Sequence, residues 1–168
     1  MIENELATNQ FMVDYLLLLV PDIDDPELDH QPNEAFNPPR WTLGHLAVYT
    51  DYALRLTGSR FACPKTWHRA FARGSKANST PSELPSKSEL VEAIVSGFTA
   101  VRERCGQLTA DELGKLHTVP FLRDTALTTV GHVLSHLMTT HFAAHLGQLS
   151  AWRRIKGRAN VEPAAPLK

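Results

Sequence analysis

The sequence predicts an all-α protein, a four-helix bundle that forms a single domain over residues 1–168 and has long loops between its helices. Two observations predict this class. Four segments repeat apolar residues at three- and four-residue steps, and no segment shows the alternation of apolar and polar residues that is typical of a strand. A length of 168 residues is also that of one ordinary domain, with little room for a second.

The first helix is predicted over residues 3–20, where apolar side chains share one stripe and neither glycine nor proline intervenes. Pro21 ends it. Residues 21–40 then hold five prolines among several acidic residues, which predicts a long loop with a solvated acidic surface. A calcium loop of the EF-hand type would need a glycine, and this loop has none. A connection of this length could let the first two helices run parallel.

The second helix is predicted over residues 41–57, with Gly58 where a helix commonly stops. At about 100° per residue, His45 falls inside an apolar and aromatic stripe that includes Trp41 and Tyr49. A lone inward histidine is most simply a hydrogen-bonded core residue, because buried polar groups are normally satisfied. His45 therefore becomes a candidate ligand only where other residues point to a site.

A second long connection covers residues 58–86, with one short helical turn predicted at residues 66–71. Connections of this length inside a compact domain are often functional. The third helix opens with a capping box formed by Ser86 and Glu89 and runs to about residue 108. Its apolar residues follow an amphipathic pattern, which is typical of a helix that serves the core.

The fourth helix is predicted over residues 128–156, after an irregular stretch, and Gly157 stands at its C-terminal end. It carries two H-x-x-x-H pairs, His132 with His136 and His141 with His145. Helical phase, at about 100° per residue, places the second pair in the middle of the buried stripe and the first pair on the opposite side. The outer pair is most simply part of a solvated face, and a second, surface metal site is the alternative.

Two imidazoles one turn apart in an apolar interior are costly unless something satisfies them. One divalent ion can bind both histidines of such a pair at about 2.0–2.1 Å. A third ligand must come from another helix, and His45 is the only other histidine on a helical core stripe. His141 is followed by Phe142, where a zincin has glutamate, which disfavours a glutamate-assisted metalloprotease. The alternative is a pair of core histidines bridged by water or by backbone carbonyls.

Other residues near the predicted site have less specific patterns. Gln148 falls on the same buried stripe and is either a hydrogen-bond partner of a ligand or an ordinary buried amide. Trp67, His68 and Arg69 are candidates for substrate contact, with Arg69 suited to a carboxylate, and an ordinary amphipathic turn is the alternative. His68 and His117 are candidates for a general base, because they lie on loops and histidine titrates near neutrality. No catalytic residue is assigned from the sequence.

Two segments together resemble the signatures of the DinB-like (YfiT-like) metal-binding proteins. They are W-T-L-G-H-L at residues 41–46 and H-F-A-A-H-L-G-Q-L at residues 141–149, the latter followed by W-R-R-I-K-G. Their order, their spacing and the four-helix layout extend the resemblance over essentially the whole chain. The resemblance implies an up-up-down-down bundle, often dimeric, with a divalent metal bound by one histidine of the second helix and two of the fourth. Carried over residue by residue, these ligands are His45, His141 and His145.

The family resemblance also implies chemistry, since its better-understood branches include thiol-dependent S-transferases and a mycothiol-dependent maleylpyruvate isomerase. Three neutral imidazoles leave a divalent ion, zinc or nickel in the first place, with open positions and its full charge. We therefore expect a metal-dependent enzyme, thiol S-transferase-like or hydrolase-like, whose partner is a small-molecule substrate such as a low-molecular-weight thiol. The alternative is a non-catalytic metal-binding or interaction bundle. A plain bundle without metal would place His45 far from the other two histidines.

Charge and cysteine content exclude several other classes. The chain has 17 Lys and Arg against 18 Asp and Glu, whereas a sequence-independent nucleic-acid binder carries a basic excess. The longest apolar run is too short to span a bilayer, and the N-terminal residues are acidic where a secretory signal is basic. The two cysteines have no C-x-x-C spacing, which favours a reduced chain. We expect a cytoplasmic protein with no nucleic-acid or membrane partner, which could form a homodimer.

Overall fold

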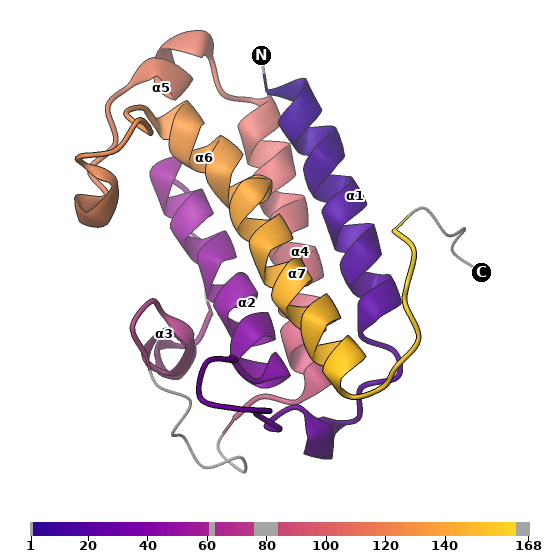
Figure 1. Cartoon of the computed structure of the whole chain (residues 1–168). Coiled ribbons are helices and arrows are strands. Elements are labelled where there is room, and N and C mark those ends of the chain that lie inside the picture. The colour runs from indigo at the N-terminus through magenta and orange to yellow at the C-terminus, as the bar shows by residue number, and fades with distance from the viewer. Residues whose placement is uncertain (1, 61–62, 76–83, 164–168) are drawn as a thin grey trace.

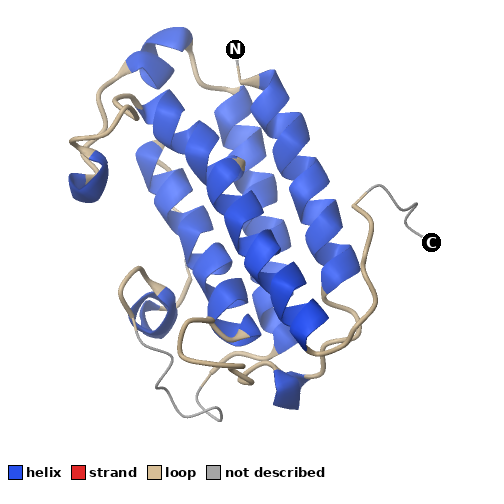
Figure 2. Ribbon diagram, in the orientation of Figure 1, coloured by secondary structure: helices blue, strands red, loops and turns tan. Residues whose placement is uncertain are grey.

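The computed structural model describes residues 2–60, 63–75 and 84–163, which form four helical columns joined by loops at both ends (Figure 1). The columns are α1 (Glu3–Leu19), α2 (Pro39–Leu56), α4 (Lys87–Gly106), and the pair α6 (Val130–Met138) and α7 (Thr140–Ile155). The shorter elements are α3 (Lys65–Phe71), α5 (Ala110–Gly114) and the 3-10 turns Asp25–Glu27 and Pro120–Leu122. Figure 2 shows only helices and loops in the described part of the chain, which confirms the predicted all-α four-helix class.

Several predicted helix boundaries agree with the structure. Ser86 and Glu89 form the capping box at the start of α4. Gly58 and Gly157 follow α2 and α7 with φ angles of 76° and 71°, a conformation that glycine adopts without strain. The short turn predicted before residue 72 is α3. Within the described ranges, no helix is both long enough and apolar enough to cross a membrane.

The helices run in an up-down-down-up order, which differs from the up-up-down-down order that the family resemblance implied. α1 and α7 end at the same end of the bundle, where Arg153 donates a hydrogen bond to the carbonyl of Leu19. α4 starts there, because Lys87 donates to the carbonyl of Val20. Figure 1 shows that α2 also starts at this end. The long first connection therefore turns back at one end of the bundle and does not cross it.

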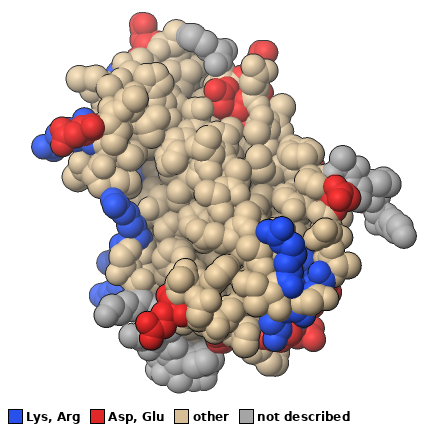
Figure 3. All heavy atoms as spheres, in the orientation of Figure 1, with Lys and Arg blue, Asp and Glu red and all other residues tan. Residues whose placement is uncertain are grey.

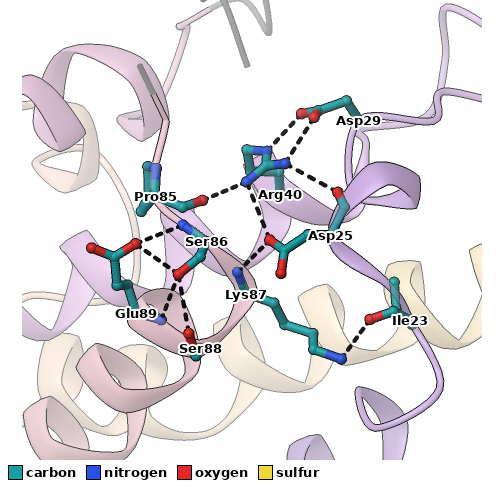
Figure 4. A network of polar contacts seen from close by, with 9 residues as sticks. All are labelled: Ile23, Asp25, Asp29, Arg40, Pro85, Ser86, Lys87, Ser88 and Glu89. Carbon is teal, nitrogen blue, oxygen red and sulfur yellow. Dashed lines mark hydrogen bonds and ion pairs between the residues drawn. The ribbon is translucent and has the colours of Figure 1, made fainter. Parts of the chain in front are cut away.

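Arg40 holds this first connection in its folded-back position (Figure 4). Its guanidinium forms two hydrogen bonds with Asp29, of 2.8 and 2.9 Å, and another with the carbonyl of Pro85 ahead of α4. Arg40 is only 5% exposed, so these acceptors satisfy a charge that would otherwise be costly to bury. Lys87 extends the network by donating to the carbonyl of Ile23 at 2.5 Å. Together these contacts bring the starts of α2 and α4 to the end of α1.

The acidic residues of the first connection also meet arginines from the far end of the chain. Asp22 accepts hydrogen bonds from Arg153 and lies 3.4 Å from a guanidinium nitrogen of Arg158. Arg158 also binds Glu27 at 2.5 Å. The hydrogen bonds from Arg153 lower the pKa of Asp22 below its usual value. The predicted acidic surface is solvent-exposed at Asp22, Asp24 and Asp25, and through Asp22 and Glu27 it also forms ion pairs with arginines at and just after the C-terminal end of α7.

The fourth column consists of two helices, and not the single helix predicted over residues 128–156. The break is at Thr139, whose φ and ψ are −120° and −84°. The hydroxyls of Thr139 and Thr140 donate to the carbonyls of Ser135 and His136, four residues earlier in each case. Threonine hydroxyls that bond in this way weaken a helix and bend it. The direction in which side chains point therefore changes between α6 and α7.

Buried Asn9 of α1 stabilises the break. Its Nδ2 donates to the carbonyl of Met138 at 2.9 Å, and its Oδ1 accepts from Arg102 of α4 at 2.8 Å. Asn9 has no exposed surface, so both of its polar atoms depend on these partners. The Met138 carbonyl at the break thus has a partner on another helix.

Replacing Asn9 with alanine is expected to lower the free energy of unfolding by about 2 kcal/mol, since it leaves the buried Met138 carbonyl and a half-buried Arg102 N–H without this partner. Urea denaturation followed by circular dichroism measures the change. Gln10→Ala is the matched control, because Gln10 is exposed and its side chain bonds Asp14 of the same helix and no other described residue. The control is expected to change stability by less than about 0.5 kcal/mol. Wild-type stability in Asn9→Ala would contradict the role given to this side chain.

Candidate metal centre

Three histidines from two helices meet in the interior of the bundle. His45 of α2 and both His141 and His145 of α7 each offer one ring nitrogen, and these three atoms lie within 4.8 Å of one another. The Nε2 atoms of His45 and His141 are 3.2 Å apart. The structure therefore brings together the three residues that the sequence selected. The alternative in which His45 lies far from the other two histidines is wrong.

The spacing of this histidine cluster fits a single divalent ion. Two nitrogen ligands at about 2.0–2.1 Å from a tetrahedral ion lie about 3.3–3.4 Å from each other, close to the 3.2 Å between His45 and His141. Imidazole nitrogens suit zinc, nickel, iron and copper. Among the described residues, no carboxylate or thiolate belongs to the cluster. The donor set is thus neutral, and it would leave a bound cation its full charge.

The short helix α3 orients His45. The Nδ1–H of His45 donates to the carbonyl of Phe71 at 2.7 Å, which leaves Nε2 with its lone pair toward the cluster. Phe71 can approach α2 this closely because residue 44 is glycine: a Cβ there would lie 2.6 Å from Cδ1 of the Phe71 ring. Trp41 stacks on the His45 ring, with centroids 4.5 Å apart. Gly44 therefore lets Phe71 pack close to α2, and this packing positions the Phe71 carbonyl that accepts the hydrogen bond from His45.

The two histidines of α7 are oriented in different ways. The Nδ1–H of His145 donates to Oε1 of Gln148 at 3.2 Å, and Gln148 is exposed, so it is a partner of the cluster and not a buried amide. The His141 ring stacks on Tyr49, with centroids 4.3 Å apart and an interplanar angle of 24°. Its Nδ1 is buried and has no hydrogen-bond partner among the described residues. A hydrogen bond thus fixes one ring, and stacking fixes the other.

Burial keeps the clustered imidazoles neutral. It lowers the pKa of His45 to about 4 and that of His141 to about 2, and the proximity of His145 contributes to both shifts. The pKa of His145 is also lowered, again chiefly by burial. Neutral imidazole is the form that binds metal ions. The cluster can therefore accept a cation near pH 7 without first losing protons.

A cavity of about 950 Å³ opens beside the cluster. His45 and His141 line it, together with the aromatic residues Trp41, Tyr49 and Tyr52 of α2. Residues 72–74 after α3, residues 115–122 ahead of α6, and α6 itself form the remaining walls. Two of the three imidazoles thus face a space that suits a small molecule, so the cluster is open to a ligand on this side.

The structure does not bring the predicted contact residues of α3 to this cavity. His68 lies on α3, and its Nε2 is 2.7 Å from Oδ2 of the buried Asp51. This contact joins α3 to α2. Trp67 packs partly buried against the core, and Arg69 is exposed. None of the three lines the cavity, so the alternative of an ordinary amphipathic turn describes them better.

His117 does line the cavity, but both of its ring nitrogens form hydrogen bonds within the loop that carries it. Its Nδ1 accepts from the backbone N–H of Val119 at 3.0 Å, and its Nε2–H donates to the carbonyl of Leu127 at 2.5 Å. Since both ring nitrogens are engaged, His117 stabilises the loop in this structure. Of the two general-base candidates, His117 lacks a free nitrogen and His68 lies away from the cavity.

His136 lies in the cavity, where the sequence did not place it. Its ring centroid is 5.7 Å from that of His141, and its Nδ1 bonds the hydroxyl of Thr140 at 2.7 Å. Helical phase counted along one continuous helix put His136 on the solvent side, and the break at Thr139 removes that relation. Its partner in the pair, His132, is exposed as predicted.

Both cysteines are buried and unbridged. Burial raises the pKa of Cys63 to about 12 and that of Cys105 to about 11, so both thiols are protonated near neutral pH. Thiolate is the reactive and metal-binding form of cysteine. Neither residue therefore supplies a nucleophile to the site, and any thiol chemistry must use a thiol from outside the chain.

Comparison with known proteins agrees with this architecture. The family model of the DinB superfamily matches residues 10–149. A search of curated proteins finds no match. Among solved structures the chain is similar to YfiT from Bacillus subtilis, described as a probable metal-dependent hydrolase with an unusual four-helix bundle topology. The TM-score is 0.71 and the identity 14%, over 94% of this chain and 88% of that one, so this likeness shows a shared fold. Because the family match covers most of its length, the chain belongs to the DinB superfamily.

Proposed function

We propose that this protein is a metal-dependent enzyme, hydrolase-like or thiol S-transferase-like, in which His45, His141 and His145 hold a divalent cation, zinc or nickel. One observation carries the proposal: two of these three histidines line the 950 Å³ cavity, so the site has both a neutral donor set and space for a substrate. When bound, such a cation supplies Lewis acidity, which lowers the pKa of a thiol or of water.

The surrounding residues prepare the site for this role. The Phe71 carbonyl and Gln148 each hold a proton on Nδ1 of their histidine, so that Nε2 of His45 and of His145 keeps its lone pair. Trp41 and Tyr49 cover the faces of the imidazoles and reduce the access of water. These contacts support a preorganised cluster in which little rearrangement accompanies binding of the cation.

Metal content tests the first part of the proposal. Protein purified without an affinity tag is expected to hold about one equivalent of metal by elemental mass spectrometry, and the His141→Ala, His145→Ala double variant almost none. His132→Ala is the matched control, because it removes an exposed histidine of α6 that lies outside the cluster and the cavity, and it should keep the metal. A wild-type protein that binds neither zinc nor nickel at neutral pH would overturn the proposal.

Turnover tests the second part. The metal-loaded protein is assayed with a panel of esters and amides, and with a low-molecular-weight thiol plus 1-chloro-2,4-dinitrobenzene. Activity that is lost in the double variant and kept in the control supports an enzyme and distinguishes hydrolysis from thiol transfer. Stoichiometric metal without any turnover would favour the non-catalytic metal-binding bundle.

The homodimer that the family resemblance implies also stays a proposal. Light scattering after size-exclusion chromatography tests it directly. A dimer gives about twice the 18.7 kDa mass of the chain, and a mass of one chain would overturn it.

A further inference from the structure

The cavity beside the histidine cluster carries positive charge and no negative charge. The charged residues among its described lining are Arg55 in the last turn of α2, Arg73 after α3 and Lys115 after α5. No aspartate or glutamate lines it, and within the described ranges no carboxylate is in ion-pair contact with any of the three. Cations from three separate segments thus share one cavity, in which Lys115 lies near Glu112 and the two arginines have no carboxylate in ion-pair contact among the described residues. This arrangement attracts an anion.

Arg73 stands at the opening of this cavity. Its Cζ lies 4.7 Å from the ring centroid of Phe121, a cation–π contact that joins the segment after α3 to the loop ahead of α6. Phe121 is 51% exposed, so the pair lies at the surface. Figure 3 shows Lys and Arg atoms along the left edge of the molecule, at the recess between the α5–α6 connection and α3. Arg73 therefore places positive charge at the exposed edge of the cavity.

Tyr49 connects the cationic opening of the cavity to the histidine cluster. Tyr49 and Arg73 line the same cavity. The Tyr49 ring in turn stacks on His141 at 4.3 Å. One side chain thus lies between the cationic opening and the cluster. A small molecule can therefore contact both.

The walls between the opening and the cluster are flat and apolar. Tyr49 and Tyr52 meet edge to face with centroids 5.1 Å apart. Leu137 and Val133 of α6 and Val119 of the loop are among the aliphatic residues of the lining. Aromatic and branched aliphatic walls favour a flat apolar body over a strongly hydrated one.

We propose that this cavity binds an organic anion with a flat apolar body. Its carboxylate, or a similar group, is held by Arg55, Arg73 and Lys115, its body lies along the tyrosines, and its other end is at the histidine cluster. What happens at that end rests on the proposed function, whereas the binding step depends only on the residues of the cavity. Arginine suits this task, because its planar fork matches a carboxylate.

The test compares 2-naphthoate with 2-naphthamide, which share a ring system and differ in charge. Each displaces the uncharged fluorescent probe N-phenyl-1-naphthylamine, from protein as purified and from protein treated with EDTA. The naphthoate is expected to bind at least tenfold more tightly than the amide in both preparations at low salt. Added salt should reduce that preference, because it screens the charges at the opening.

Variants assign the preference to the proposed residues. Arg55→Gln, Arg73→Gln and Lys115→Gln together are expected to abolish it and to leave the affinity for the amide within about twofold. Arg55→Lys with Arg73→Lys should keep most of it, since the charge remains. Arg69→Gln with Arg154→Gln removes two exposed arginines that do not line the cavity and should leave the preference unchanged.

Several results would overturn the proposal. They are equal affinity for the two ligands in the wild type, a preference that survives the glutamine substitutions, and the same loss in the Arg69, Arg154 control. A preference that disappears with EDTA would also overturn it, since the anion would then bind a metal and not the arginines. Because the expected preference does not need metal, failure of the proposed metal site would leave this result unaffected.

Discussion

Replacing Gly44 with alanine is expected to lower the free energy of unfolding by about 2 kcal/mol and the affinity for zinc by about 10- to 100-fold. The new methyl group would overlap the ring of Phe71, so α3 must move away from α2. The Phe71 carbonyl then no longer accepts from Nδ1 of His45, and the orientation of that imidazole is lost. Urea denaturation of the metal-free protein measures the first effect, and competition with a chromophoric chelator measures the second.

Gly147→Ala is the matched control for this prediction. Gly147 lies in α7 between His145 and Gln148, and a Cβ there would meet no atom within 4 Å among the described residues. The substitution should stabilise the protein by up to about 1 kcal/mol, because alanine favours the helix over glycine, and should leave zinc affinity unchanged. Equal zinc affinity in Gly44→Ala and Gly147→Ala would show that α3 does not position His45.

Acid is expected to destabilise the metal-free protein strongly. The folded state holds His45 and His141 neutral, with pKa values of about 4 and about 2, whereas an unfolded histidine has a pKa of about 6.5. Below pH 6.5 the unfolded state therefore binds more protons than the folded state, and the free energy of unfolding decreases as the pH is lowered. These two histidines together should remove about 4 kcal/mol between pH 7 and pH 5, and the loss should continue toward pH 4. His145, whose pKa is lowered too, adds to the loss.

Urea denaturation in EDTA at pH 7, 6 and 5, at constant ionic strength, measures this dependence. His141→Phe should flatten the slope by up to about 1.4 kcal/mol per pH unit, the contribution of one proton. Exposed His132→Gln should leave the slope as it is in the wild type. A stability that stays constant from pH 7 to pH 5 would mean that the cluster is open to water and not buried.

Local rules in the sequence predict much of this structure. The capping box at Ser86 and Glu89 and the glycines at 58 and 157 mark helix ends through backbone chemistry that depends on a few neighbouring residues. Helical phase selects His141 and His145 because both lie in α7, where the helix is regular between them. The inward direction of His45 follows in the same way from α2.

Features that depend on distant contacts could not be predicted in this way. The break at Thr139 involves Asn9, a residue 130 positions earlier, and nothing near Thr139 resembles a proline or glycine break. The helical phase therefore predicted the wrong direction for His136, because His136 and His141 lie on opposite sides of the break. The direction of α2 depends on how the first loop folds back onto Arg40, and the length of a loop does not determine that.

The far end of the chain also determines when this protein can finish folding. α7 carries two of the three clustered histidines as well as Arg153, which binds an aspartate 131 residues earlier. During synthesis α1, α2 and α4 emerge first, and until α7 follows, the acidic loop lacks this arginine and His45 lacks the two other histidines. Contacts of such long separation also slow folding relative to bundles built from neighbouring helices. The nascent chain thus exposes the parts of α1 and α2 that pack on α6 and α7 until α7 has been synthesised, and this is the stage at which a chaperone would encounter it.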